Sequence, residues 1–587
     1  MATVFVRSAR CCSKFFSQQP SYVYYSTALP SAVGFDDYEK ACKTYRLRAP
    51  KYFNFVSDVI EQWALRERKE DRKLPALWWV NDKGTELKWS FTQLVNLSSK
   101  AANVLTGPLG LRKGDRVIAI LPRLPQWWLL NLACVRTGIV LLPGTVMLTS
   151  EDIQFRLQAS KATCVITDDA HMDHVDAVLP QCPGVKSKAV ICDSRHRKDW
   201  LDFDEHLNQA SAVHQCVETL AEDPMQIFFT SGTTGKPKMT LHTQASYGLG
   251  HVYTGRHWLD LTDKDIMWNM SDTGWAKAAY CSVFAPWLQG ACSFVQHSEH
   301  KFDPVSTLKN LEMYPITGFF SPATGYAMLV QEKLTDYKLN AALRHCTSGG
   351  ESLNPEVALA WLRGTGQQAR QGYGQTETVL VCGSFRCLED KPGSIGKPSP
   401  GVDLTIVDDE GKEIGVGQEG NIAIYMKPER PFWLFREYVD DPQRTAKAFN
   451  GDYFLFGDRG FKDEDGYLYF VGRSDDVIVS AGYRIGPFEV ESALIEHPAV
   501  AESAVVSSPD PTRGEVVKAF VIRSEAYKNA DETALAKELQ DHVRQKTAAY
   551  KYPRKVEFVD QLPKTISGKI RRVELRNKEW QEVRGQR

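Results

Sequence analysis

The sequence predicts an α/β fold with a large N-terminal domain of layered α/β sheets, a small β-barrel-like subdomain and a small α+β C-terminal domain. Helical patterns alternate with short apolar runs from residue 52 to about 229, and the same style continues over residues 225–385. The pattern changes near residue 400 to short strands, and changes again after Arg473. A chain of 587 residues also exceeds one ordinary core, so two or more domains are expected.

The first part of the chain alternates strand and helix signals. Residues 117–121 and 163–167 are apolar runs of strand length, and residues 127–137 between them have the composition of a buried helix. Such alternation indicates layers with largely parallel sheets. We place the large domain at residues 31–474.

Shorter elements follow toward the C-terminus. Residues 402–407, 421–426 and 467–471 are predicted antiparallel strands of a β-rich subdomain at about 395–474. The C-terminal domain, residues 475–587, is expected to hold helices at 487–497 and 534–546 and strands at 502–507, 516–522 and 555–559. Pro487 suits the first turn of its helix.

Composition excludes several classes of protein. The net charge is about −1, from 71 basic and 72 acidic residues, which does not favour nucleic acid or a membrane surface as a partner. The longest apolar region, residues 127–143, is too short to span a bilayer and contains Asn131 and Arg136. The 13 cysteines form no C-x-x-C pair, so we expect a reducing compartment and no zinc site. His297 and His300 are interpreted as solvated loop residues.

The first 30 residues differ from the rest. Arg7, Arg10 and Lys14 alternate with apolar and hydroxyl residues, and no acidic residue precedes Asp36. This composition is typical of a mitochondrial transit peptide and predicts a location in the mitochondrial matrix. An unstructured tail without an address is the alternative.

One loop carries a phosphate-binding composition. A predicted buried strand at residues 225–229 leads into two glycines, several hydroxyl residues and two lysines. Glycines let backbone N–H groups approach an anion, and lysines add positive charge. The loop is not a P-loop, because only Thr233 and Thr234 separate Gly232 from Gly235. A glycine-rich surface turn is the alternative reading. The candidate phosphate-binding residues are Thr230, Ser231, Gly232, Thr233, Thr234, Gly235, Lys236, Pro237 and Lys238.

Five further motifs follow in order. They are Ser348-Gly349-Gly350-Glu351, Gly372-Tyr373-Gly374-Gln375-Thr376-Glu377-Thr378, Gly457-Asp458-Arg459, Gly472-Arg473-Ser474-Asp475-Asp476 and Pro563-Lys564-Thr565-Ile566-Ser567-Gly568-Lys569. From about residue 52 to the C-terminus, their order and spacing resemble the adenylate-forming superfamily of acyl-CoA synthetases, firefly luciferase and peptide-synthetase adenylation domains. Residues 268–277 and 483–487 are most similar to the mitochondrial medium-chain acyl-CoA synthetases.

The resemblance implies a two-step ligase. A fatty carboxylate attacks the α-phosphate of ATP to give acyl-adenylate and pyrophosphate, and the thiol of coenzyme A then displaces AMP. It implies ATP, Mg²⁺ (or Mn²⁺) and coenzyme A as cofactor and co-substrates, with Lys569, Thr376 and Glu377 catalytic and Glu377 the metal ligand. Asp475 is the implied hinge about which a mobile C-terminal domain rotates. The protein is expected to be a monomer or a homo-oligomer.

Further residues receive roles from the same resemblance. The nucleotide site is implied to contain Gly349, Gly350, Glu351, Gln371, Gly372, Tyr373, Gly374, Gln375, Asp458 and Arg473. Candidate contacts for the remaining substrate and coenzyme A are Ala481, Gly482, Tyr483, Arg484, Arg513, Tyr552, Pro553 and Arg554. The substrate pocket is expected to include Trp275, Gly374, Thr376 and Arg484.

Two positions bear on specificity and activity. Acetate-activating relatives carry a tryptophan where this chain has Gly374, so an open pocket for medium-chain acids is expected. Relatives usually have threonine where this chain has Phe456, which removes a hydroxyl beside the nucleotide. Benzoate-like, aromatic or short-chain acids remain alternative substrates, and a catalytically silent nucleotide-binding paralogue is the alternative of a different class.

Overall fold

The computed structural model describes residues 23–24, 35–45, 47–192, 197–232, 235–299, 302–480, 483–510, 513–548, 550–565 and 569–585. The predicted transit peptide lies almost wholly outside these residues. Only β1 (Val23–Tyr24) of that segment is described, and it pairs in parallel with β2 (Leu47–Arg48). Within the described part of the chain, no helix has the length and apolar character needed to cross a membrane.

The first of two large sheets has a parallel centre with an antiparallel edge. Its strands, in spatial order, are β21 (Glu437–Tyr438), β11 (Gly235–Thr243), β10 (Pro224–Gly232), β6 (Val140–Gly144), β5 (Arg116–Ile120), β7 (Cys164–Asp168), β8 (Ser187–Ile191) and β9 (Leu201–Asp202). The six strands from β10 to β9 pair in parallel, whereas β11 and β21 pair antiparallel.

The second large sheet repeats this plan. Its order is β18 (Lys397–Pro398), β17 (Cys382–Gly383), β16 (Ala369–Tyr373), β15 (His345–Gly349), β14 (Gly318–Phe320), β12 (Ile266–Asn269), β13 (Cys292–His297), β3 (Leu77–Asn81) and β4 (Glu86–Trp89). The strands from β16 to β3 are parallel, and the short flanking strands are antiparallel.

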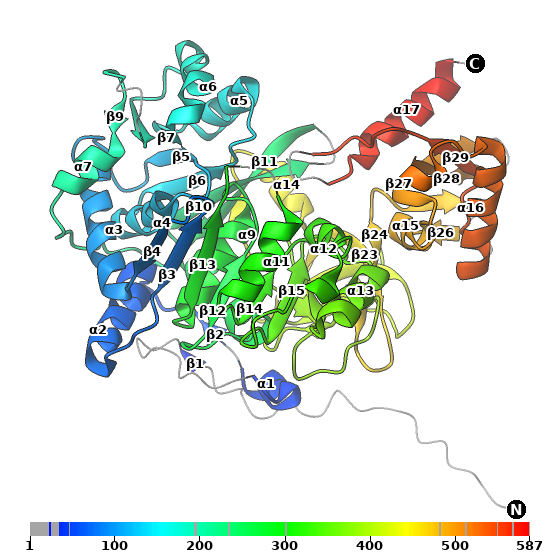
Figure 1. Ribbon diagram of the computed structural model, residues 1–587, viewed down its shortest axis with the longest axis horizontal. Helices are drawn as coiled ribbons and strands as arrows, with labels where there is room; N and C mark the ends of the chain where they lie inside the picture. The colour runs from blue at the N-terminus through cyan, green and yellow to red at the C-terminus, as the bar shows by residue number, and fades with distance from the viewer. Residues whose placement is uncertain are drawn as a thin grey trace, which may run out of the picture.

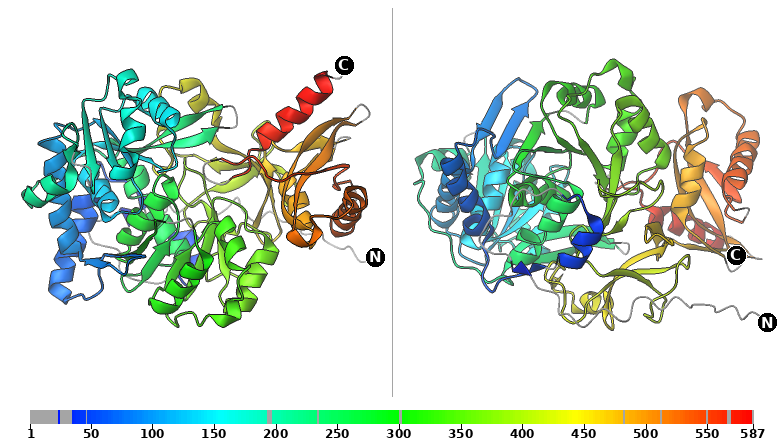
Figure 2. Two further views of the ribbon diagram at one scale, coloured as in Figure 1. Left: turned by 45° about the horizontal axis from the view of Figure 1, so that its top comes forward. Right: turned by 90° about the horizontal axis from the view of Figure 1, so that it is seen from below.

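Helices fill the space between the sheets and cover their outer faces (Figures 1 and 2). They are α1 (Tyr38–Thr44), α2 (Glu61–Glu70), α3 (Phe91–Thr106), α4 (Pro125–Thr137), α5 (Ser150–Ser160), α6 (Met172–Asp176), α7 (Phe203–Gln209), α8 (Gln244–Gly248), α9 (Ala276–Ala279), α10 (Ala285–Leu288), α11 (Pro304–Met313), α12 (Ala323–Leu329) and α13 (Pro355–Thr365). Short 3-10 and π segments are η1 (Val56–Ile60), η2 (Asp169–His171), η3 (Leu179–Gln181), η4 (Thr254–Trp258), η5 (Tyr280–Phe284) and η6 (Leu334–Asp336).

Side chains of β5 alternate between two hydrophobic cores, which shows why the layers form. Val117 and Ala119 face a core that also holds residues of β3, α3 and α4. Ile118 and Ile120 point the other way, into a core shared with α5 and α6. Because successive side chains of a strand alternate between faces, an apolar run buries both faces of the sheet. The layered α/β prediction is therefore confirmed.

The predicted buried helix is α4, and it begins two residues earlier than the sequence pattern indicated. Pro125 occupies its first turn, where a missing N–H costs nothing. Gly138 ends it in the left-handed region with φ +69°.

The expectation that His297 is a solvated loop residue is wrong. His297 is the last residue of β13, and its ring stacks on Trp79 with centroids 5.9 Å apart. His300 lies outside the described residues.

Residues near 400–473 form a separate antiparallel sheet. Its strands are β19 (Leu404–Val407), β20 (Gly420–Tyr425), β22 (Phe449–Asn450), β23 (Tyr453–Lys462) and β24 (Leu468–Arg473), with α14 (Pro442–Lys447) alongside. The antiparallel pairing agrees with the prediction. Among the described residues this sheet is open, so strand pairing does not close the barrel that the sequence suggested.

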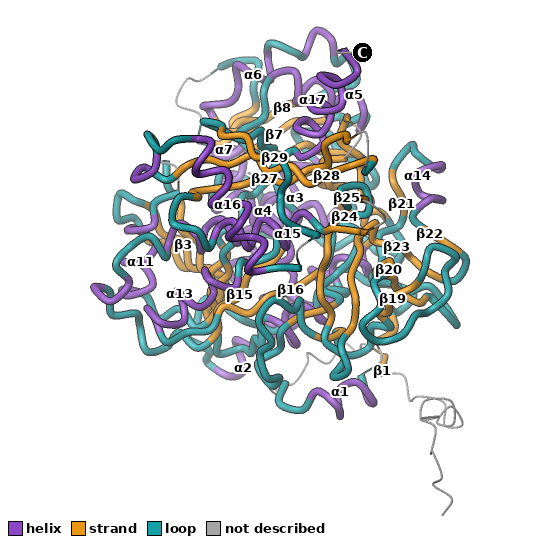
Figure 3. The backbone as a smooth tube through the Cα atoms, turned by 90° about the vertical axis from the view of Figure 1, so that its right-hand side faces the viewer, coloured by secondary structure: helices purple, strands orange, loops and turns teal. Residues whose placement is uncertain are grey.

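The C-terminal unit is a mixed sheet with helices on both faces. It contains β25 (Ile478–Ser480), β26 (Tyr483–Ile485), β27 (Val500–Asp510), β28 (Gly514–Arg523), β29 (Lys555–Phe558), α15 (Pro487–Ile495), η7 (Glu525–Tyr527), α16 (Glu532–Lys546) and α17 (Arg572–Gly585). Figure 3 views this unit from outside, with α16 toward the reader. The core under α15 and α16 is distinct from the one under α17.

Candidate active site

The described ends of the predicted phosphate loop belong to two antiparallel strands, β10 and β11. Strands β10 and β11 pair with Thr230 opposite Lys238, and a bulge separates Thr230 from Gly232. Thr233 and Thr234 lie outside the described residues, and the side chains of residues 231–236 are not described. Among the described residues, none hydrogen-bonds to the buried hydroxyl oxygen of Thr230. Thr230 therefore holds a buried hydroxyl at the base of the loop without a partner among the described residues.

Glu377 is a buried carboxylate held by two neighbours. The Nζ atom of Lys238 lies 2.6 Å from its Oε1 atom, and the Tyr438 hydroxyl donates to the same oxygen at 2.7 Å. Burial alone would raise the pKa of Glu377, but Lys238 and Tyr438 outweigh it and the pKa lies below its usual value. Glu377 is therefore an anion at neutral pH.

Whether this anion fits a divalent cation depends on its surroundings. In the described part of the chain, no three His, Cys, Asp or Glu side chains are grouped to hold a metal ion. Mg²⁺ commonly binds one or two carboxylates together with substrate phosphates. A single ionised carboxylate beside the phosphate hairpin fits that donor set, with the nucleotide supplying the other oxygens.

The glycines of the expected adenine platform are required by close packing. Gly349 and Gly372 lie opposite each other on the parallel strands β15 and β16. A Cβ atom on Gly349 would come 2.9 Å from the Gly372 carbonyl oxygen, and one on Gly372 would come 2.4 Å from the Trp258 ring. Trp258 therefore forms the floor of this region.

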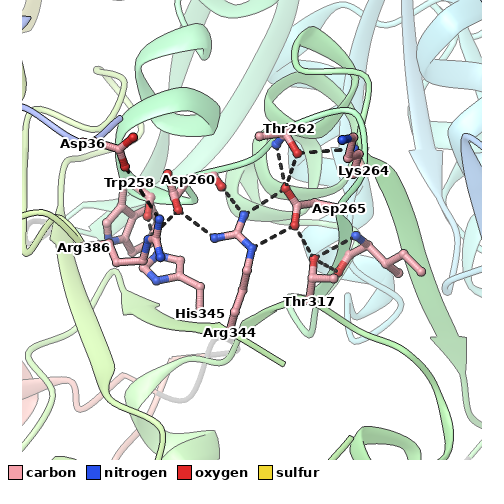
Figure 4. Close-up of polar contacts among 11 residues, drawn as sticks. Asp36, Trp258, Asp260, Thr262, Lys264, Asp265, Thr317, Arg344, His345 and Arg386 are labelled. Carbon is pink, nitrogen blue, oxygen red and sulfur yellow. Dashed lines mark hydrogen bonds and ion pairs between the residues drawn. The ribbon is translucent and has the colours of Figure 1, made fainter. Parts of the chain in front are cut away.

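A charged network braces the backbone of Trp258 (Figure 4). The buried His345 ring donates from Nε2 to the Trp258 carbonyl oxygen at 2.6 Å. Burial lowers the pKa of His345 to about 4, so this ring is neutral. Arg344 bridges Asp260 and Asp265, which flank the following turn. The network fixes the segment on which the platform rests.

Asp458 lies where three donors converge. It accepts from the Tyr373 hydroxyl at 2.5 Å, from Gln375 Nε2 at 2.9 Å and from Arg473 Nη1 at 2.8 Å. Asp458 and Arg473 are paired across β23 and β24. Phe456 packs its ring 5.3 Å from that of Tyr373. The aromatic side chain at position 456 thus adds packing against Tyr373 in the place of a hydroxyl.

Thr376 is positioned through its backbone. His242 of β11 donates from Nε2 to the Thr376 carbonyl oxygen at 2.6 Å, and the Ser246 hydroxyl lies 3.1 Å from the Nδ1 atom. Burial lowers the pKa of His242 to about 4, so the neutral ring can donate from Nε2 and accept at Nδ1. The hairpin and the Gln-Thr-Glu motif are thereby fixed to each other.

Lys569 reaches this site from the C-terminal unit. Its Nζ atom donates to the Gly350 carbonyl oxygen at 2.9 Å. The Thr565 amide donates to the Lys569 carbonyl oxygen at 2.7 Å, and the Lys569 amide donates to the Thr565 hydroxyl oxygen at 3.1 Å. In Figure 1 the segment leading into α17 extends from the C-terminal unit toward the large sheets.

The predicted hinge residue is held by the last helix. Arg576 of α17 donates to the Asp475 carbonyl oxygen at 2.6 Å and to Asp476 Oδ1 at 3.0 Å. The Arg473 Nε atom lies 3.6 Å from Asp475 Oδ1. The hinge therefore contacts both the Asp458–Arg473 pair and the helix that follows Lys569.

The described coenzyme A candidates lie in β26 or just before β28 and β29 of the C-terminal unit. Tyr483 is exposed and stacks on Tyr550 with ring centroids 4.3 Å apart. Arg554 donates to the Tyr552 hydroxyl at 2.7 Å, and Arg513 adjoins the strand position that pairs with Ser480. Ala481 and Gly482 lie outside the described residues, and the side chain of Arg484 is not described. Pro553 stands between Tyr552 and Arg554.

The structure gives Gly374 a different reason for lacking a side chain. A Cβ atom there would come 2.5 Å from the Val379 carbonyl oxygen. The backbone alone therefore demands glycine, so Gly374 by itself is weak support for an open acyl pocket. Trp275 immediately precedes α9, and Tyr280 stacks on the buried His251 ring at 4.8 Å.

Sequence reasoning missed four residues that the fold brings to this site: Trp258, His242, Tyr438 and Lys277. None lies in a glycine-rich motif. Lys277 is the last residue of the segment 268–277 that resembles the medium-chain acyl-CoA synthetases, and the other three carried no signal in the sequence.

Asp458 is buried and paired with the partly exposed Arg473. Together with the phosphate hairpin, the glycine platform and a lysine from the C-terminal unit, this pair defines an adenylate-forming enzyme. Comparison with known proteins agrees with this class. Residues 62–438 match the AMP-binding enzyme family, and residues 489–569 match the AMP-binding enzyme C-terminal domain. The chain therefore belongs to the AMP-binding enzyme family.

Several similar proteins are acyl-CoA synthetases or CoA ligases. The chain is 53% identical over 582 residues to acyl-coenzyme A synthetase ACSM3, mitochondrial, of Mus musculus, covering 98% of this chain and 99% of that protein. A Brucella canis acyl-CoA synthetase structure superposes with a TM-score of 0.70 at 32% identity, covering 94% and 100% of the two chains. The anthranilate CoA ligase AuaEII in complex with anthranoyl-AMP gives a TM-score of 0.80 at 28% identity, covering 91% and 99%.

Proposed function

We propose that this protein is an AMP-forming acyl-CoA synthetase that uses ATP and coenzyme A. In the first step a carboxylate oxygen attacks the α-phosphorus of ATP and pyrophosphate leaves. In the second step the sulfur of coenzyme A attacks the acyl carbon and AMP leaves. The observation that carries the proposal is the contact of Lys569 with the Gly350 carbonyl oxygen, because it brings a C-terminal cation to the nucleotide platform.

Each step builds negative charge on oxygen atoms, so fixed donors should supply much of the catalysis. We assign the β- and γ-phosphates to the 230–238 hairpin and the ribose hydroxyls to Asp458. Thr376, whose backbone is fixed by His242, is assigned to the α-phosphate. Lys569 would hold the carboxylate and α-phosphate together during the first step.

Glu377 is the residue proposed to hold Mg²⁺ or Mn²⁺, which would neutralise phosphate charge when bound. In the present arrangement Lys238 neutralises Glu377. On nucleotide binding, Lys238 has a second partner in the phosphates, so its ammonium can turn to them and release the carboxylate. Tyr438 donates to the same Oε1 atom and would keep Glu377 oriented during this exchange.

The C-terminal unit is proposed to rotate about Asp475 between the steps, withdrawing Lys569. The same proposal places the domain boundary at Asp475 and the coenzyme A contacts at Ala481 to Arg484, Arg513 and 552–554. Supporting them is the placement of the hinge between the Asp458–Arg473 pair and α17.

Medium-chain fatty acids are the proposed substrates. Burying each CH₂ of an acyl chain is worth roughly 0.8 kcal/mol, so an apolar pocket beside Trp275 and Tyr280 would favour octanoate over acetate. Aromatic acids are the second candidate class, favoured by the high TM-score to an anthranilate ligase. The protein is proposed to act in mitochondria, as the name of its ACSM3 relative suggests, and within them in the matrix.

Pyrophosphate release with ATP and Mg²⁺ tests the class, and a panel of acetate, butyrate, octanoate, palmitate and benzoate with coenzyme A tests the substrate. We expect carboxylate-dependent release that is largest with octanoate. No pyrophosphate release with any acid would favour the catalytically silent alternative. The observation that supports this alternative is Phe456, which stands where relatives usually have threonine. A maximum with benzoate would replace the fatty-acid assignment by the aromatic one.

A further inference from the structure

A second lysine stands beside Lys569 at the nucleotide platform. Lys277 lies in α9, and its Nζ atom donates to the Gly349 carbonyl oxygen at 3.0 Å. Lys569 donates to the next carbonyl along the chain, that of Gly350, at 2.9 Å. Two ammonium groups from different domains therefore occupy adjacent backbone acceptors.

The backbone leaves room for the Lys277 ammonium. Gly350 has φ +89°, and a Cβ atom on it would come 2.0 Å from Lys277 Nζ. Any side chain at position 350 would displace this ammonium. Gly350 is thus a glycine both for its left-handed conformation and for the cation packed against it.

The segment that carries Lys277 is anchored on both sides. Asn269 of β12 donates from Nδ2 to the Lys277 carbonyl oxygen at 3.2 Å and to the Ser282 hydroxyl at 2.9 Å. The Tyr247 hydroxyl donates to the Ala276 carbonyl oxygen at 2.7 Å. These contacts hold α9 within the large domain, so Lys277 does not depend on the C-terminal unit for its position.

The electrostatics of this pair favour an anion. Burial, and next the charge of Lys569, lower the pKa of Lys277 to about 8, while the Glu351 carboxylate and the Cys281 thiol oppose the shift. Among the described residues, no carboxylate forms an ion pair with Lys277 or Lys569. Neighbouring ammonium groups repel each other, and an anion between them removes that cost.

We propose that Lys277 is a substrate-binding residue, whose ammonium holds the carboxylate of the acid in the first step and its acyl carbonyl oxygen after Lys569 withdraws. This rests on the proposed ligase function. The acid is the assigned anion because Lys277 directly follows Trp275 and is held by Asn269 of β12, in the second sheet. The phosphate hairpin belongs to the first sheet. Lys277 stays with the large domain and so supplies the positive charge that the second step would otherwise lose.

Lys277→Met removes the charge with little change of length, and Lys277→Arg keeps it. Lys309→Met is the matched control, because Lys309 is exposed on α11. Since a hydrogen bond to a charged group is worth roughly 1.5–3 kcal/mol, we expect Lys277→Met to raise the KM for octanoate about tenfold to a hundredfold. The KM for ATP should stay within about twofold, and Lys277→Arg should restore most of the affinity for octanoate.

Two readouts separate this role from a structural one. In the wild type and in Lys309→Met, kcat/KM for the acid should fall above about pH 8 as Lys277 loses its proton, because this ratio reports groups of the free enzyme. Lys277→Arg should lose that alkaline fall. With supplied acyl-adenylate, Lys277→Met should also slow thioester formation about tenfold or more.

An unchanged KM for octanoate together with normal thioester formation in Lys277→Met would overturn the proposal. A rise in the KM for ATP alone would assign the lysine to the phosphates instead and would overturn it equally. Loss of all acyl-CoA formation in the wild type is a different outcome, because it would refute the ligase function itself. Thermal unfolding of each variant shows whether a loss comes from folding, and Lys277→Arg serves as the folded comparison.

Discussion

Replacing Lys569 by alanine should damage the first half-reaction and spare the second. The Nζ atom donates to a carbonyl of the nucleotide platform at 2.9 Å, and removing one well-placed donor from such a site costs about 3 kcal/mol of barrier. That cost corresponds to roughly a hundredfold slower adenylation. The backbone contact between Thr565 and position 569 should persist, because the Thr565 amide donates to the Lys569 carbonyl oxygen at 2.7 Å and this bond needs no lysine side chain.

The assay separates the two steps. Pyrophosphate release with octanoate, ATP and Mg²⁺ reports adenylation, and loss of free coenzyme A thiol with supplied octanoyl-adenylate reports thioester formation. Lys564→Ala is the matched control on the same turn, since Lys564 pairs with Glu502 at 2.9 Å within the C-terminal unit. We expect the control to remain near wild-type in both assays. Equal damage to both half-reactions by Lys569→Ala would refute the alternating-domain reasoning.

Three further predictions concern the metal, the pH dependence of stability and the C-terminal core. Glu377→Gln should raise the Mg²⁺ concentration for half-maximal pyrophosphate release at least about tenfold, since it removes the charge of a hard ligand. Tyr438→Phe keeps the carboxylate and should change this Mg²⁺ concentration less than about threefold. Equal changes in the two variants would contradict the assignment of Glu377 to the metal. Burial lowers the pKa of His242 from 6.5 to about 4, so the stability it contributes is intact above about pH 6.5 and is lost as the pH falls toward 4, by about 3 kcal/mol. Urea unfolding at pH 7 and pH 5 should therefore show a decline about 2 kcal/mol smaller for His242→Gln than for the wild type, and an identical decline would be evidence against the neutral histidine. Lys518→Met should lower the free energy of unfolding by about 3–5 kcal/mol, because it leaves Glu579 buried without its cation; an unchanged thermal midpoint of the C-terminal unit would show that the pair is unimportant.

Local composition explains why so much of the fold could be predicted. The apolar run at residues 117–121 became β5, and Pro125 and Gly138 delimit α4. These signals lie within a few residues of one another, and each directly favours a local backbone conformation. The phosphate hairpin was foreseen as a loop after a strand, but its return strand β11 was not, because the antiparallel partner follows only from the sheet order.

The site was harder to predict where its parts come from distant segments. Tyr438 contacts Glu377 only because β21 pairs with β11 at the edge of the first sheet. Trp258 supports the glycine platform from η4, and its sequence context carries no glycine or charge pattern that indicates this role. Gly374 shows the converse: a Cβ atom there would come 2.5 Å from the Val379 carbonyl oxygen, a reason for glycine that only the tertiary structure reveals.

The chemical class could be predicted from the amino-acid chain, because adenylation needs particular residue types at short spacings and those motifs are contiguous. The pairs of charges could not: Lys238 meets Glu377, Asp458 meets Arg473, and Lys277 lies beside Lys569 only in the folded protein. Electrostatic interactions depend on separation in space and on burial, and both follow from how the two large sheets and the C-terminal unit pack together.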